Sequence, residues 1–263
     1  MLDRLAARTR APFCLLLALV ALAALVYPVC GSAQTTLSIS AAASVKDALA
    51  DVETAYAKSQ THLEFRNNFG SSGTLAMQID QGAPADVFLS AAAKPMDDLE
   101  AKGLIVAGTR GNLLRNSLVL IAPLDSQLHG FQGLTGSAVR TIALGDPASV
   151  PAGQYGRQTL ASLHLLDKVG AKLVLGKDVR QVLTYVETGN ADAGLVYATD
   201  AQISSKVRVV ATAPDSAHDP IVYPVAVVKG SRNEQAARGF VVYLSSPAAK
   251  AIFVDHGFTI AAP

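Results

Sequence analysis

Short apolar runs rich in β-branched residues alternate along the chain with longer stretches whose apolar residues recur every three or four positions. The runs predict strands and the stretches predict helices. The expected strands are 36–40, 62–65, 85–90, 118–122, 141–144, 193–197, 207–211 and 221–228. The expected helices are 44–58, 72–81, 93–102, 153–163, 178–188, 236–244 and 247–254. This alternation predicts an α/β fold with mostly parallel sheets.

Two of the expected strands, at about 117–122 and 222–228, are long and apolar and lie roughly 100 residues apart. A chain that leaves one lobe near the first strand and returns near the second makes two lobes with two hinge-crossing segments. We therefore expect one lobe from residues 34–116 plus 224–263 and another from 117–223. The cleft between such lobes is the natural ligand site.

The first 33 residues have the order of a secretory signal peptide. Three arginines precede an apolar run at 13–26, and the small residues Gly31, Ser32 and Ala33 follow it. The run of about 14 residues is shorter than the roughly 20 that a membrane-spanning helix needs. We expect cleavage after Ala33 and export to the periplasm of a bacterium. A membrane anchor, or a lipid attached to Cys30 despite the bulky Val29 before it, is the less favoured alternative.

The composition excludes several classes of protein. Only 16% of the residues are charged and the net charge is +1, so there is no basic footprint for nucleic acid. Both cysteines, Cys14 and Cys30, lie in the predicted leader, which argues against a disulfide scaffold or a zinc–thiolate site. The five histidines have no metal-ligand spacing. We therefore expect no cofactor and no metal held directly by protein atoms.

Four of the expected helices begin with small or polar residues, and two of these starts fall in each expected lobe. The starts are Ser44, the pair Ser71 and Ser72, Ala152 between Pro151 and Gly153, and Val179 after the expected N-cap Asp178. A helix start has free N–H groups and a partial positive charge, so it can bind an anion. Ser and Asp are also common N-caps, so each start alone has a plain structural explanation.

Together the four starts would surround an oxyanion with donors, without a need for Arg or Lys. Tyr197, at the end of the expected strand 193–197, faces the same crevice in an α/β lobe and is a further expected donor. Lys172, Lys177 and Arg180, near the Val179 helix, are expected on a solvated face.

At these residues the chain resembles the molybdate-binding proteins of bacterial ABC importers. The matching segments cover nearly all of residues 37–260 in the family's order, and APADVFLSA and GDPxxVPAG are fairly specific to the family. The segments are AAASVKDAL, SSGTLAMQIDQGAPADVFLSA, NSLVLIAP, GDPASVPAGQYG, KDVRQVLTYVETG, GLVYATDA, YPVAVV and Phe253 to Phe258.

The resemblance implies a two-lobed periplasmic binding protein of the type II, Venus-flytrap kind. Such a protein binds molybdate, and usually tungstate, and passes it to a membrane permease with its ATPase. It would act as a monomer, not as an enzyme, and without nucleic acid. By position the resemblance assigns the oxyanion to Ser44, Ser72, Ala152, Val179 and Tyr197, with Ser71 as the neighbouring candidate.

One residue departs from the family pattern, and other functions stay open. Gly73 stands where serine is often expected, which implies a more flexible loop or one fewer hydroxyl. One alternative is the same fold with sulfate or another anion as its ligand, and a further alternative is a sensor that signals to a partner. A secreted serine hydrolase is the remote alternative, because Ser72 in GSSG does not lie in a G-x-S-x-G elbow and no later His segment resembles a triad partner.

Overall fold

The computed structural model describes residues 34–60 and 62–262. The predicted signal peptide 1–33, its cleavage after Ala33 and the alternative lipid anchor on Cys30 lie outside the described residues. In the part that is described, no helix is both long and apolar enough to cross a membrane. The described chain is organised around two β-sheets.

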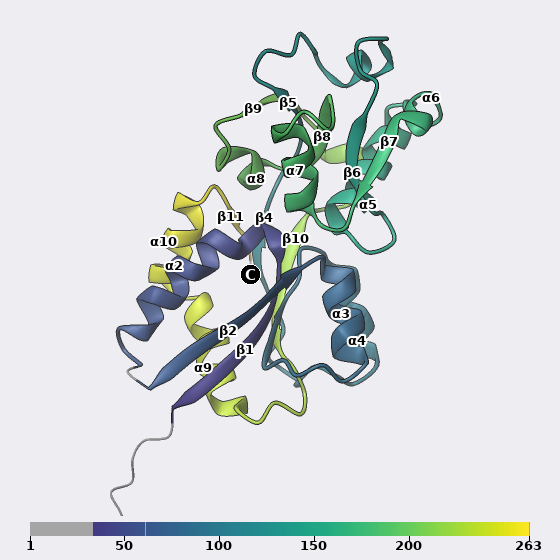
Figure 1. Ribbon diagram of the computed structural model, residues 1–263. Coiled ribbons are helices and arrows are strands. Elements are labelled where there is room, and N and C mark those ends of the chain that lie inside the picture. The colour runs from purple at the N-terminus through teal and green to yellow at the C-terminus, as the bar shows by residue number, and fades with distance from the viewer. Residues whose placement is uncertain (1–33, 61, 263) are drawn as a thin grey trace, which may run out of the picture. The chain divides into compact units, whose positions relative to one another are not determined.

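The first sheet has six strands in the order β11-β4-β10-β3-β1-β2 (Figure 1). Strand β1 is parallel to β2 and β3, whereas β10 is antiparallel to β3 and β4. The strands are β1 (Thr35–Ala42), β2 (Leu63–Gly70), β3 (Val87–Leu89), β4 (Gly111–Arg115), β10 (Val222–Val227) and β11 (Thr259–Ile260).

Helices cover both faces of this sheet, and we call the sheet with its helices the first lobe. Successive strand residues point to opposite faces. Accordingly Val87 and Leu89 pack in the cluster that contains Leu49 of α2, while Phe88 packs with Leu75 of α3. One face carries α2 (Lys46–Ala57), α9 (Glu234–Leu244) and α10 (Pro247–Asp255), and the other carries α3 (Ser72–Asp80) and α4 (Ala93–Ala101).

The second sheet has five strands in the order β7-β6-β8-β5-β9, and we call it and its helices the second lobe. Gly194 of β8 lies against Val182 of α7, and the next residue, Leu195, lies against Gly156 of α5, so the two helices cover opposite faces. The elements are β5 (Leu118–Pro123), β6 (Ile142–Gly145), α5 (Pro151–Ser162), α6 (Leu166–Val169), β7 (Leu173–Gly176), α7 (Val179–Glu187), β8 (Ala193–Tyr197), α8 (Ala198–Gln202) and β9 (Val207–Thr212).

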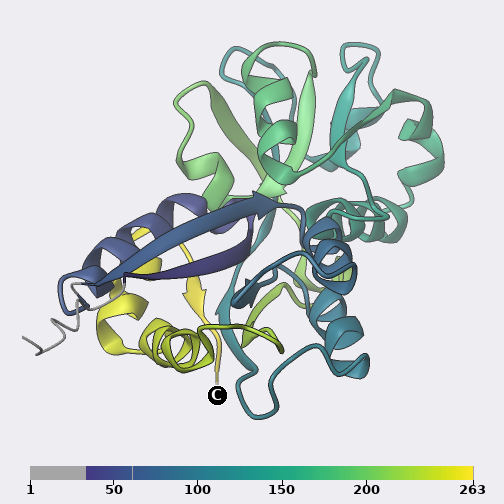
Figure 2. The same cartoon turned by 60° about the horizontal axis from the view of Figure 1, so that its bottom comes forward.

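The chain passes between the two sheets twice, from β4 to β5 and from β9 back to β10 (Figure 2). The first crossing spans only two residues, Asn116 and Ser117, between its strands. These crossings agree with the expected pair of hinge segments. The lobe boundaries at 116/117 and 223/224 stay a prediction.

The expectation of mostly parallel sheets is wrong, because both sheets are mixed. Strand β10 enters the first sheet from the second lobe and so runs against β3 and β4, and β5 runs against both β8 and β9. Hydrophobic alternation does not report pairing direction, since either arrangement buries the same faces. The sequence pattern also missed β4, β7 and β11, which are short or partly exposed.

Candidate functional site

All of the residues expected at the ligand site line one small cavity between the lobes. The cavity is narrow, and the volume open to the centre of a water-sized sphere is about 10 Å³. None of the described residues that line it carries a charge. The lining residues are Ala42, Ala43, Ser44, Gly70, Ser71, Ser72 and Ala91 from the first lobe and Val150, Pro151, Ala152, Val179 and Tyr197 from the second.

Ser44 is not the helix N-cap that the sequence predicted. It lies inside a 3-10 turn, η1 (Ala43–Val45), which precedes α2, and no side chain caps either helix. Its buried hydroxyl instead lies 3.0 Å from the hydroxyl of Tyr223. The 3-10 turn therefore places Ser44 at the cavity, and its side chain contacts Tyr223.

The surroundings of Tyr223 give the Ser44 hydroxyl a direction. The Nδ2 group of Asn116 donates to the Tyr223 hydroxyl over 3.3 Å, and an amide nitrogen can only donate. A Tyr223 hydroxyl that accepts from Asn116 has its own proton available for Ser44, and a Ser44 hydroxyl that accepts this proton keeps its own for the cavity. Burial raises the pKa of Tyr223 well above its ordinary value, so the phenol keeps its proton.

Ser71 and Ser72, which the sequence left as neighbouring candidates, have different hydrogen bonds. Ser71 is the N-cap of α3: its Oγ accepts from the Thr74 N–H over 3.3 Å and donates to the Thr74 Oγ1 over 2.8 Å. Ser72 Oγ accepts from the Ala91 N–H over 2.8 Å. Since that leaves the Ser72 proton uncommitted, Ser72 is the better placed donor.

Two helix starts in the second lobe supply backbone donors. Helix α5 begins at Pro151, two residues earlier than expected, which suits the preference of proline for the first helical position. Helix α7 begins at Val179, after the predicted N-cap Asp178, whose carboxylate accepts from the Gln181 N–H over 2.9 Å. The N–H groups of Ala152 and Val179 lie in first turns, where no intrahelical acceptor is available.

Gly153 lets α5 begin this close to the cavity. A Cβ atom at this position would lie 1.9 Å from the carbonyl oxygen of Gly145 at the end of β6. The glycine thus serves the close contact between the helix and the strand.

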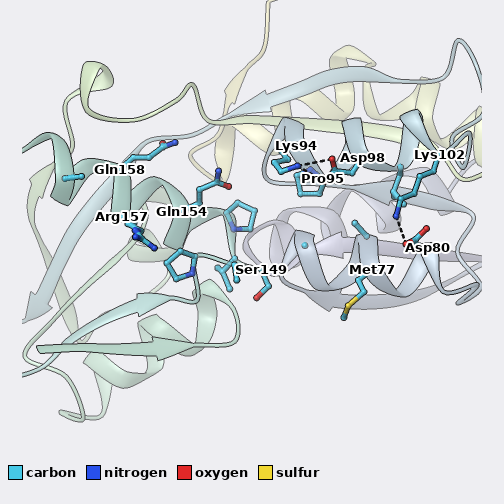
Figure 3. Close-up of a pocket in the computed structure, with 18 residues that line it drawn as sticks. Met77, Asp80, Lys94, Pro95, Asp98, Lys102, Ser149, Gln154, Arg157 and Gln158 are labelled. Carbon is cyan, nitrogen blue, oxygen red and sulfur yellow. Dashed lines mark hydrogen bonds and ion pairs between the residues drawn. The ribbon is translucent and has the colours of Figure 1, made fainter. Parts of the chain in front are cut away.

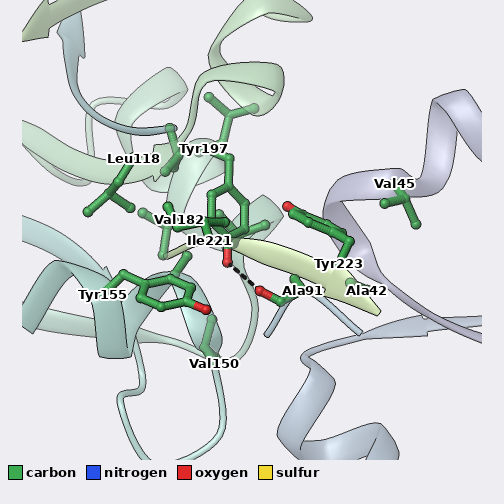
Figure 4. Close-up of a cluster of buried hydrophobic side chains, with 14 of the residues drawn as sticks. Ala42, Val45, Ala91, Leu118, Val150, Tyr155, Val182, Tyr197, Ile221 and Tyr223 are labelled. Atoms are coloured by element: carbon green, nitrogen blue, oxygen red, sulfur yellow. Dashed lines mark hydrogen bonds between the residues drawn. The ribbon is translucent and has the colours of Figure 1, made fainter. Parts of the chain in front are cut away.

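Tyr197 ends β8, as predicted, and reaches across the lobe junction (Figure 4). Its hydroxyl donates to the carbonyl of Ala91 over 3.4 Å, which is long for an O–H···O bond. Burial, followed by the nearby Tyr223, raises the pKa of Tyr197 well above its ordinary value. The hydroxyl therefore keeps its proton, and it can donate a hydrogen bond to a better acceptor in the cavity.

Arg180 does not lie on the solvated face that the sequence predicted. Its side chain is 23% exposed and forms ion pairs with Asp200 at 2.6 Å and Asp47 at 2.8 Å. The expectation is also wrong for Lys172, whose Nζ donates to the carbonyl groups of Leu134 and Gly136. Sequence reasoning had no signal for these long-range contacts, nor for Asn116 and Tyr223.

A larger groove borders the cavity, between α3 and α4 of the first lobe and α5 of the second (Figure 3). Its lysines are engaged on the surface, Lys94 with Asp98 at 2.9 Å and Lys102 with Asp80 at 2.6 Å. Carboxylates thus line this groove beside the cations. The uncharged cavity, which has donors and no carboxylate among its described lining residues, is the better candidate for an anion site.

Comparison with known proteins places the chain in a family. Residues 37–259 match the family model of the bacterial extracellular solute-binding proteins. The chain belongs to this family. It is 48% identical to the putative ABC transporter substrate-binding lipoprotein YvgL of Bacillus subtilis, over 86% of this chain and 87% of the relative. It is 44% identical to the molybdate-binding protein ModA of Haemophilus influenzae, over 87% and 91%.

A solved structure of this family has the same fold. The periplasmic molybdate-binding protein of Azotobacter vinelandii superimposes with a TM-score of 0.77 at 28% identity, over 86% of this chain and 100% of that chain. The predicted two-lobed α/β fold of type II and the predicted family resemblance are both confirmed. The family consists of solute-binding transport proteins.

Proposed function

We propose that this solute-binding protein captures molybdate, and tungstate, in the periplasm and delivers it to an ABC permease with its ATPase. The observation that carries the proposal is the uncharged cavity, to which both lobes contribute hydrogen-bond donors. The similarity to proteins named as molybdate-binding supports it. Ser44, Ser72, Ala152, Val179 and Tyr197 would hold the oxygens of the anion, and no protein atom would touch the metal.

Protonation distinguishes molybdate from phosphate in such a cavity. Molybdate at neutral pH is a fully deprotonated dianion and only accepts hydrogen bonds, so a site of donors satisfies every oxygen. Hydrogen phosphate carries a proton that needs an acceptor. Leaving that proton unpaired costs roughly 1–3 kcal/mol. The proposed site therefore rejects phosphate by its lack of acceptors.

Size, and not charge, must distinguish molybdate from sulfate. Sulfate is also a dianion that only accepts hydrogen bonds, but its S–O bonds are shorter than Mo–O bonds. In a cavity fitted to the larger anion, sulfate leaves donors beyond hydrogen-bond distance. Tungstate has nearly the size of molybdate, and we expect it to bind comparably.

Closure follows from the placement of the donors. An anion that accepts from Ser72 in one lobe and from the Val179 N–H in the other has more contacts in the closed state, so it selects that state. Hydrogen bonds to an ion are short and strong, and exclusion of water strengthens them further. The closed form is the one that we expect the permease to recognise. The protein would act as a monomer and without a cofactor.

The alternative of a serine hydrolase gains no support from the cavity. None of its described lining residues is His, Asp or Glu, so Ser72 has no neighbouring general base there. The donors that surround it suit a bound anion better than a nucleophile.

Isothermal titration calorimetry on the chain from Gln34 onward tests the proposed function. We expect tight 1:1 binding of molybdate and tungstate, far weaker binding of sulfate and no detectable binding of phosphate. Comparable affinities for sulfate and molybdate would favour the alternative that this fold serves another oxyanion. No binding of any of the four anions would refute an oxyanion site.

A further inference from the structure

Arg180 connects the two lobes beside the proposed oxyanion cavity. It is the second residue of α7 in the second lobe, directly after Val179. Its Nη2 donates to the Asp47 carboxylate over 2.8 Å and to the carbonyl oxygen of Ser44 over 3.3 Å, both in the first lobe. Its Nε donates to Asp200 over 2.6 Å within its own lobe. One guanidinium thus spans the junction.

These contacts link Arg180 to several of the groups assigned to the anion. Val179 precedes it in the chain, and the Ser44 carbonyl accepts from it. The fully buried Asp200 also accepts from the Tyr197 N–H over 3.3 Å through its second oxygen. A shift of the guanidinium would therefore move donors on both sides of the cavity.

The chemistry of the side chain suits this task. A guanidinium presents several donors in one rigid plane and can engage acceptors on different elements at once, which a single ammonium group cannot do with the same geometry. Asp200 is 0% exposed, so it anchors the guanidinium in the second lobe. Asp47 is 43% exposed, so its contact can open without leaving a carboxylate buried.

We propose that Arg180 is a positioning residue that fastens the second lobe to the first and holds the Ser44 hydroxyl and the Val179 N–H in register across the cavity. Its role at the site rests on the proposed function. None of its contacts uses the anion. The contacts of Arg180 with the first lobe therefore favour the closed state before an anion binds, and they slow dissociation of the anion afterwards.

Asp47→Asn is the decisive variant, because it weakens the contact across the junction and leaves the pair of Arg180 with Asp200 intact. We expect molybdate affinity to fall roughly fivefold, the range of a partly exposed ion pair, mainly through faster dissociation. In small-angle X-ray scattering without any anion, the variant should be more open than the wild type. Asp51→Asn is the matched control, since Asp51 lies one turn further along α2 and pairs with His256 inside the first lobe.

A double-mutant cycle separates fastening from a merely structural role. Arg180→Lys keeps a cation beside Asp200 but cannot reach Asp47 in the same way, so it should lower molybdate affinity by a similar factor. Adding Asp47→Asn to Arg180→Lys should then change little, because both substitutions remove the same contact. Additive losses, or an Asp47→Asn variant that matches Asp51→Asn in affinity and in scattering, would overturn the proposal.

The two proposals fail in different ways. If the wild type does not bind molybdate, the proposed function is wrong, and the scattering comparison without anion still decides whether Arg180 fastens the lobes. If the wild type binds molybdate and Asp47→Asn changes neither affinity nor scattering, the proposed function stands and the role of Arg180 is refuted.

Discussion

The N–H of Gly73 donates to the carbonyl oxygen of Ser149 over 3.0 Å, and this bond joins the start of α3 in the first lobe to the loop before α5 in the second. Gly73 was the residue that departed from the family pattern. A Cβ atom there would lie 2.6 Å from the Ser149 oxygen and 2.9 Å from its Cα. The absence of a side chain is therefore what lets the two backbones meet.

Gly73→Ala should weaken molybdate binding and spare the fold. The added methyl meets backbone on the opposite lobe and so opposes closure, while alanine is the better helix former. We expect at least a tenfold loss of affinity, an effect of about 1.4 kcal/mol or more, with an unchanged or higher melting temperature of the anion-free protein. Calorimetry and thermal unfolding measure the two effects.

Gly170→Ala is the matched control for Gly73→Ala. Gly170 is exposed, and a Cβ atom at its position would meet no atom within 4 Å. If Gly73→Ala bound molybdate as tightly as this control, the close backbone contact at Ser149 would have no part in closure.

Tyr197→Phe should cost one charge-assisted hydrogen bond to the anion. The hydroxyl makes a long bond to the Ala91 carbonyl, so the loss of this contact costs little when the hydroxyl is removed. We expect molybdate binding to weaken by roughly 1.5–3 kcal/mol. Calorimetry beside Tyr243→Phe, a change in the aromatic cluster of the first lobe, checks this, and equal affinities would remove Tyr197 from the ligand set.

Tyr223→Phe should weaken molybdate binding by a smaller amount. Its hydroxyl lies against Ser44 and does not line the cavity, so the substitution removes the orientation of one donor and not a donor itself. We expect a loss of roughly 0.5–1.5 kcal/mol, the range of a single neutral hydrogen bond. A Tyr223→Phe/Ser44→Ala double variant that loses no more affinity than Ser44→Ala alone would show that Tyr223 acts through Ser44. Independent, additive losses would contradict this.

The sequence predicted those parts of the site best in which the interacting residues are close together in the chain. Asp178 and Val179 were placed correctly because an N-cap and the free N–H groups of a first turn depend on neighbours within three residues. Ser44 was assigned to the cavity, yet its partner is Tyr223, 179 residues away. No periodicity or motif in a single chain reports such a contact.

The contacts of Arg180 and the directions of the strands could not be predicted from the sequence. From the sequence alone, an arginine at the start of an amphipathic helix is expected to be solvated. In the folded chain, the packing of α7 against η1 brings Arg180 to Asp47. Similarly, the strand pattern of 222–228 predicted a buried strand correctly but carried no information on its direction. Both properties arise when distant segments meet, so they appear only in the folded chain.

The stability of the protein should fall as pH rises from about 4.5 to about 7, because of Glu53. Burial in α2 raises the pKa of this carboxyl from 4.5 to about 7, against a smaller opposing effect of its hydrogen bond from Asn67. Among the described residues, Glu53 Oε1 and Asn67 Oδ1 are buried acceptors without a partner, so a proton suits the pair better than a charge. Below pH 4.5 the carboxyl is protonated in both the folded and the unfolded chain. Above that pH the unfolded chain releases the proton first, so the free energy of unfolding declines until Glu53 ionises in the folded state as well.

Urea denaturation at pH 5 and pH 8 measures this decline, and Glu53→Gln, which stays neutral, should remove much of it. The exposed Glu64→Gln is the control, and a decline of equal size in both variants would exclude Glu53 as its source.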